Sequence, residues 1–164
     1  MAADLDAMAR RVIDGNHYMT LGTQAADGRI RLSPVYFTAA RHTDFYWLSS
    51  PEAHHSRNVE EHPEVELVIY DSTARVGEAE AVYVAATARR IADDELDDVI
   101  GEAFHARAGA GAFTAEDLRG DADLRLYVAH ALRWDVHVPG RHPLHGTGLD
   151  RRVPADPTQD RGRG

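Results

Sequence analysis

The chain of 164 residues contains no cysteine and no lysine. Without cysteine it forms no disulfides, thiolate nucleophiles or sulfur-based zinc sites, so redox chemistry would need a cofactor. Without lysine it forms no Schiff base to pyridoxal phosphate or a carbonyl substrate. All eighteen basic side chains are therefore arginines.

Positive charge and long apolar runs are also scarce. The formal net charge is −9 and the pI is near 5.5, so we expect no nucleic-acid partner. Charged residues interrupt the first sixteen positions, and no apolar run approaches the roughly 18 residues that cross a bilayer. We therefore expect no membrane segment and a soluble, cytoplasmic protein.

The length predicts one folded domain, which we place at residues 1–138. Residues 139–164 are rich in proline, glycine and arginine, and we expect them to form a disordered tail. His142 and His145 lie in this segment and His137 just before it, without a carboxylate at helical spacing, so we expect no metal site.

Hydrophobic periodicity predicts a mainly β, α+β chain. The spacing of apolar residues indicates an amphipathic helix from Leu5 to Ile13, closed by Gly15 or Asn16. Strands are predicted over 18–23, 30–37, 45–49, 65–70 and 79–91, with a final strand pair inside 124–137, and Asp27-Gly28 predicts a hairpin. Helices are predicted over 50–59, 93–106 and, briefly, from 114. Consecutive strands with short inserted helices favour a closed antiparallel barrel.

The densest polar cluster stands at the predicted helix over 50–59, with Ser50 as N-cap and Pro51 in the first helical position. Ser49-Ser50-Pro51 leads into His54-His55-Ser56-Arg57-Asn58. Free N–H groups at a helix start, with hydroxyls and a guanidinium, suit a phosphate. A capped surface helix with solvated polar residues explains the same pattern, and spacing alone leaves both interpretations open.

Several motifs in unbroken order resemble the FMN-binding split-barrel family, that is, the pyridoxamine 5'-phosphate oxidase-like family with its actinobacterial flavin and deazaflavin branch. The resemblance runs from residue 10 to residue 91 and continues loosely to residue 137. The matching motifs are Met19-Thr20-Leu21-Gly22-Thr23, Asp27-Gly28, Ser33-Pro34-Val35-Tyr36-Phe37, Phe45-Tyr46-Trp47-Leu48-Ser49-Ser50, Ser56-Arg57-Asn58-Val59 and His62-Pro63-Glu64-Val65.

This resemblance implies a six-stranded antiparallel split β-barrel with short flanking helices, forming a homodimer with FMN in grooves between the subunits. It implies that Arg31 meets the phosphate, that residues 47–50 touch the flavin ring and ribityl chain, and that residues 55–57 hold phosphate. A lysine is frequent in the family where His55 falls. The implied cofactor residues are Arg31, Ser33, Pro34, Val35, Trp47, Leu48, Ser49, Ser50, His55, Ser56 and Arg57.

The chain departs from the vitamin B6 oxidase itself. Ala81 aligns with a glutamine, and the Arg-x-His substrate signature lacks its aromatic context around Arg141, so pyridoxamine phosphate is not the expected substrate. We expect an FMN-dependent oxidoreductase acting on another small molecule, with no catalytic side chain identified because the flavin supplies the hydride chemistry.

Two alternatives stay open: an F420-dependent reductase, or a non-catalytic flavin or tetrapyrrole-binding protein. FMN is favoured over F420 because the anionic tail of F420 needs a basic groove. The segment 93–98 is acidic, and many arginines fall in the expected tail: Arg151, Arg152, Arg161 and Arg163.

Overall fold

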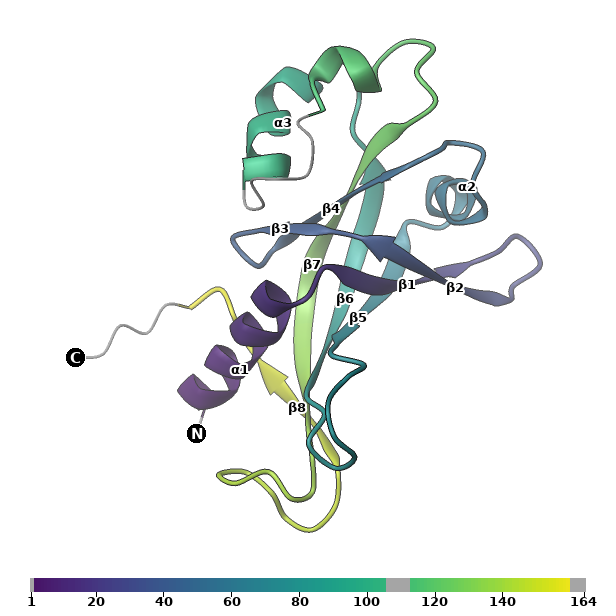
Figure 1. Ribbon diagram of the computed structural model, residues 1–164. Helices are drawn as coiled ribbons and strands as arrows, with labels where there is room; N and C mark the ends of the chain where they lie inside the picture. Colours follow the sequence, from purple (N-terminus) through teal and green to yellow (C-terminus); the bar gives the residue numbers. More distant parts are fainter. Residues whose placement is uncertain (1, 106–112, 160–164) are drawn as a thin grey trace.

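The computed structural model describes residues 2–105 and 113–159 as one antiparallel sheet, curled on itself, with helices packed around it (Figure 1). The sheet order is β2-β1-β5-β6-β7-β4-β3, and β8 pairs with β7. Strands β2 and β4 also contact each other, so the sheet closes into a half-barrel. The elements are α1 (Ala2–Gly15), β1 (Tyr18–Gln24), β2 (Ile30–Tyr36), β3 (Thr38–Ala40), β4 (Asp44–Ser49), α2 (His54–Glu61), β5 (Glu64–Tyr70), β6 (Ala81–Arg90), α3 (Leu96–His105), the 3-10 helix η1 (Ala115–Leu118), β7 (Arg125–Val138) and β8 (Arg151–Ala155).

The predicted mainly β, split-barrel fold is confirmed, and its hairpin forms where the sequence indicates. Gly28 adopts a φ of +80°, which glycine reaches without steric cost. Asp27 supports the turn because its Oδ1 accepts the Arg29 N–H at 3.1 Å. The hairpin then pairs β1 with β2 from Gln24 opposite Ile30 to Tyr18 opposite Tyr36.

Alternating side chains on β4 and β7 build two cores, one on each side of the sheet. Phe45 and Trp47 point into the half-barrel, which is closed at one end by the apolar stripe of α1. Tyr46 lies on the opposite face with Leu126 of β7, under α3 and η1. None of the helices in residues 2–105 and 113–159 is long and apolar enough to cross a membrane.

Strand number differs from the six expected. The predicted pair within 124–137 is the single strand β7, and Leu132 is the residue at which the second predicted strand began. Ala131 pairs with Ala86 while Arg133 pairs with Ala85, so Leu132 is an extra residue in a β-bulge. A bulge reverses the inside-outside alternation, which made one strand look like two. The short β3 and the late β8 complete the eight strands.

The predicted disordered tail is wrong for the segment that ends at Gln159. β8 pairs with β7 from Arg151 opposite Val138 to Ala155 opposite Trp134. Beyond it, the Asp156 N–H donates to buried Asp6 Oδ1 of α1 at 2.7 Å, so the residues that directly follow β8 lie beside α1 (Figure 1). Residues 160–164 of that prediction lie outside the described residues, as does residue 106 of the predicted helix over 93–106.

The glycines before β8 mark a tight loop rather than disorder. A Cβ on Gly140 would come within 2.7 Å of backbone atoms, and one on Gly146 within 2.5 Å. These contacts exclude any larger side chain without a backbone shift. The glycine-rich composition therefore reflects close backbone packing.

Candidate functional site

Strands β2 and β4 and helix α2 bring the predicted phosphate residues to one end of the half-barrel. Arg31 lies opposite Thr23 in the hairpin, and Ser33 lies opposite Leu21, so all four share the inner face of the sheet. Thr23 is tied to α2 because Asn58 Nδ2 donates to its Oγ1 at 2.9 Å. Arg31 therefore stands on the same side of the hairpin as α2.

Helix α2 begins later than predicted. Its first residue is His54 and its N-cap is Ala53, which offers no capping side chain. The predicted cap Ser50 closes a preceding turn instead: its carbonyl accepts the Ala53 N–H at 3.1 Å and its Oγ accepts the Glu52 N–H at 3.2 Å. This turn satisfies Ser50 locally and leaves the N–H groups at the helix start without a capping side chain.

Ser49, His55 and Ser56 form a hydrogen-bonded group behind the helix start. Ser56 Oγ donates to Ser49 Oγ at 3.1 Å, and His55 Nε2 lies 2.8 Å from that oxygen. Burial lowers the pKa of His55, and neighbouring His54 lowers it further. His55 is therefore neutral near pH 7 and offers a hydrogen bond rather than a positive charge. Ser56 is fully buried, so it supports Ser49 from within the fold.

Two exposed guanidinium groups supply the positive charge at this end. Arg57 forms an ion pair with Glu52 of the preceding turn. Arg31 makes no ion pair within residues 2–105 and 113–159. We call the set Arg31, Ser33, Ser50, His55 and Arg57 the polar rim.

The other predicted cofactor residues divide by burial. Trp47 and Val35 are buried in the half-barrel core, where Trp47 stacks on Tyr127 with ring centroids 5.6 Å apart. Leu48 is half-buried on the other face of β4, and Pro34 is exposed on β2. Trp47 and Val35 therefore pack the core, while Leu48 and Pro34 remain available to a ligand.

Two buried residues that support the polar rim were not identified from the sequence. Thr23 and Tyr127 are both buried against the rim, Thr23 through Asn58 and Tyr127 beneath Trp47. Burial raises the pKa of Tyr127, an effect that the Ser56 hydroxyl opposes, so Tyr127 stays a neutral phenol. No local signal marks either residue, because both roles depend on contacts distant in sequence.

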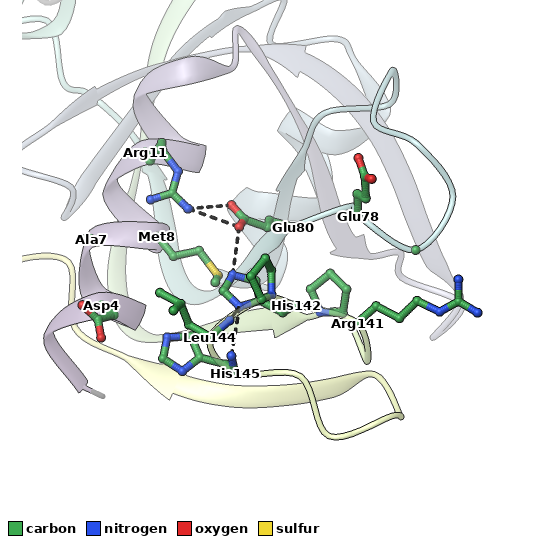
Figure 2. A pocket seen from close by; sticks show the side chains of 13 residues that line it. Asp4, Ala7, Met8, Arg11, Glu78, Glu80, Arg141, His142, Leu144 and His145 are labelled. Carbon is green, nitrogen blue, oxygen red and sulfur yellow. Dashed lines mark hydrogen bonds and ion pairs between the residues drawn. The ribbon is translucent and has the colours of Figure 1, made fainter.

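A cavity of about 500 Å³ lies away from the polar rim, between α1 and the loop that leads to β8 (Figure 2). Glu80 binds Arg11 at 3.0 Å and lies 3.4 Å from His142 Nε2. His142 Nδ1 accepts the N–H groups of Leu144 at 3.2 Å and His145 at 3.1 Å, which makes it a fixed part of the loop.

His145 stacks on His142 with ring centroids 5.0 Å apart. Arg141 extends away from this cluster in Figure 2. Among the described residues, no group of three histidines and carboxylates converges as a metal site. The contacts around His142 therefore indicate that this residue holds the loop before β8 in a fixed conformation.

On the outer side of the hairpin, β5 and β6, three large apolar side chains are exposed next to the exposed carboxylates Glu64 and Glu66. Ile30, Leu32 and Leu132 are 68%, 70% and 64% exposed. They border a hollow of about 530 Å³, where Arg152 stacks over the Tyr83 ring at 4.3 Å. We call Ile30, Leu32 and Leu132 the bare face.

Comparison with solved structures shows a shared fold. A heme binding protein from Mycobacterium smegmatis has a TM-score of 0.68 and 19% identity, over 94% of this chain and 59% of that one. The heme storage protein HutZ from Vibrio cholerae has a TM-score of 0.58 and 18% identity, over 88% and 98%. A structure described as an F420 reductase has a TM-score of 0.55 and 13% identity, over 76% and 94%.

The present chain therefore spans 59% of the length of the Mycobacterium smegmatis protein. A search of curated proteins finds no match. The sequence profile of the family described as Pyridoxamine 5'-phosphate oxidase matches residues 5–137, which include the hairpin, the polar rim and nearly all of β7. The chain belongs to the pyridoxamine 5'-phosphate oxidase family.

Proposed function

We propose that the chain binds FMN at the polar rim and acts as an oxidoreductase on a small molecule. The observation that carries this proposal is the placement of two exposed arginines beside the uncapped start of α2: Arg31 lies opposite Thr23, and Arg57 precedes Asn58, which donates to Thr23. Guanidinium groups and helix-start N–H groups are the donors that a phosphate monoester requires.

The residues of the polar rim and their neighbours would contact different parts of FMN. Arg31 and Arg57 would neutralise the phosphate, while the Ser50 hydroxyl and the neutral His55 would add hydrogen bonds. Pro34 and Leu48 would offer apolar contact to the flavin ring. FMN supplies the hydride chemistry, so no side chain of the chain is needed as a general acid or base.

We further propose a homodimer that forms through the bare face. Contiguous exposed apolar surface on a sheet marks an interaction site, and a self-complementary patch gives a two-fold dimer. β2 contributes Leu32 to the bare face and Arg31 to the polar rim, on alternate sides of the same strand. A second copy on the bare face would therefore lie next to the bound flavin.

FMN is favoured over F420 by the distribution of charge. Arg152, expected in a free tail, lies in β8 and is paired with Asp135 at 3.0 Å. Asp97 and Asp98 occupy the first turn of α3. An extended polyanion would therefore find little unpaired positive charge beyond the rim.

Tetrapyrrole binding is the second candidate, and two observations favour it. Two of the compared structures are described as heme binding and heme storage proteins. In the loop before β8, His145 Nε2 is buried without a hydrogen-bond partner in the described part of the chain. An imidazole nitrogen of this kind is a usual axial ligand of haem iron.

Titration of the cofactor-free protein with FMN, riboflavin, F420 and haemin tests these proposals. We expect FMN to bind most tightly, and Arg31→Ala to weaken FMN by about 1.5–3 kcal/mol, the scale of a hydrogen bond to a charged group, while riboflavin changes little. Arg29→Ala is the matched control, because Arg29 is an exposed arginine in the turn of the same hairpin. Saturation by haemin alone, or tighter binding of F420 than of FMN, would contradict the FMN proposal.

A further inference from the structure

A small cavity of about 160 Å³ lies between the outer face of β4 and helix α3. Its walls include Tyr36, Tyr46, Leu48, Phe104, Phe113 and Leu126. None of the described side chains that line it carries a formal charge. We call it the ring cavity.

The volume and walls of the ring cavity match one aromatic ring. An apolar protein cavity of about 150 Å³ accommodates benzene, so a single six-membered ring fits this space. The rings of Phe104 and Phe113 lie 6.0 Å apart at an interplanar angle of 33°. Aromatic walls of this kind favour a planar guest through offset and edge-to-face contacts.

The surroundings of the ring cavity disfavour an anionic guest. Burial raises the pKa of Tyr46 to about 12, and Glu102 and Asp44 contribute to this rise. Tyr46 therefore stays a neutral phenol, and Glu102 and Asp44 are both paired with Arg41, so the charges near the cavity largely balance. An anion would also lose its hydration against apolar walls without gaining a partner.

The cavity also lies beside the proposed flavin position. Leu48 forms part of its wall and is followed directly by Ser49 and Ser50 at the end of β4. We infer that the ring cavity takes an uncharged, single-ring aromatic molecule as the substrate class of this protein. The inference rests on the proposed FMN site for its catalytic meaning, while the cavity itself is formed by this chain alone.

Fluorine NMR with two probes of matched shape tests the inference: neutral 4-fluoroacetophenone and anionic 4-fluorobenzoate. With full-length protein, free and loaded with FMN, we expect the neutral probe to bind about tenfold more tightly than the anion. Phe113→Ala removes a half-exposed wall and should weaken the neutral probe about fivefold. Tyr70→Ala, an aromatic truncation at an exposed site outside the cavity, should leave its affinity unchanged.

The outcomes separate the inference from the proposed function. FMN binding without binding of the neutral probe would overturn the ring cavity and leave the flavin proposal standing. Binding of the neutral probe to a protein that never takes up FMN would support the ring cavity and overturn the flavin proposal. Equal affinity for the two probes, or equal losses in Phe113→Ala and Tyr70→Ala with unchanged circular dichroism, would also overturn the inference.

Discussion

The outer face of the curled sheet has two apolar regions, and the described helices cover one of them and leave the other exposed. Outside β4 and β7, Tyr46, Leu126 and Val128 are buried beneath α3 and η1 (Figure 1). Outside the hairpin and the bulge of β7, the apolar side chains of the bare face stay exposed, and no described helix packs over them. A sheet stabilises a domain by burying its apolar faces, so the bare face is the surface that the proposed dimer would cover.

The largest expected effect is a difference in the free energy of unfolding between a variant under α3 and a variant of the bare face. Leu96 of α3 is 1% exposed, and Leu96→Ala should lower the free energy of unfolding by about 2–5 kcal/mol because it leaves a cavity. Leu132→Ala on the bare face should change it by less than about 0.5 kcal/mol in dilute protein. Urea unfolding at low protein concentration measures both. Similar losses in the two variants would show that the bare face is stabilised within one chain.

The second prediction tests what covers the bare face. Leu32→Arg places an unpaired charge at the centre of the proposed dimer, so we expect the dimer dissociation constant to rise about 100-fold. Leu144→Arg is the control, since Leu144 is equally exposed but lies in the loop before β8. Sedimentation equilibrium gives both constants. A wild-type protein that remains monomeric at micromolar concentration with FMN bound would contradict the dimer.

Local signals made several elements of the fold predictable. The Asp27-Gly28 turn, the apolar stripe of α1 and the strand over 45–49 depend on neighbours in sequence, and each forms as predicted. Long-range pairing made the rest unpredictable. β8 is held by β7 and by Asp6 of α1, far away in the chain, while its composition alone suggests disorder.

The candidate site shows the same limit. Polar residues around Ser50 and Arg57 mark the rim in the sequence, yet two backbone details depend on the fold. Ser50 closes a turn instead of capping α2, because the turn through Pro51 uses its carbonyl and hydroxyl first. Trp47 fills the half-barrel because β4 alternation sends it inward. The resemblance to the family indicates which residues belong to the site. The direction in which each side chain points depends on the register of its strand, which the sequence alone does not give.

The third prediction concerns the polar rim, which alternation on β2 separates from the bare face. Arg57→Ala should weaken FMN binding by about 1.5–3 kcal/mol and leave riboflavin binding and the dimer constant unchanged. Glu52→Ala releases Arg57 from its ion pair, so this variant should bind FMN at least as tightly as wild type. Fluorescence titration of the variants measures the affinities. Equal losses for FMN and riboflavin would mean that Arg57 supports the fold rather than the phosphate.

The smallest expected effect is a pH dependence that belongs to the rim and is absent from the bare face. Burial, aided by His54, lowers the pKa of His55 below its ordinary value of 6.5. Between the two pKa values the unfolded chain binds more protons at this residue than the folded chain, so stability rises with pH in that window. The contribution of His55 is therefore complete above pH 6.5 and is lost as the pH falls through the window.

His55→Gln keeps a polar group beside Ser49 but removes the titration. We therefore expect FMN-free wild type to lose stability relative to His55→Gln as the pH falls from 7 toward 5, with no further divergence between pH 7 and 8. Urea unfolding of both proteins across this range measures the difference. His17→Gln is a control of the same chemistry, because His17 stacks on Tyr36 away from α2. If wild type and His55→Gln kept a constant difference in unfolding free energy from pH 8 to pH 5, then His55 would titrate equally in both states. The lowered pKa of His55 would then be wrong, and part of the His55 population would be protonated beside the phosphate near neutral pH.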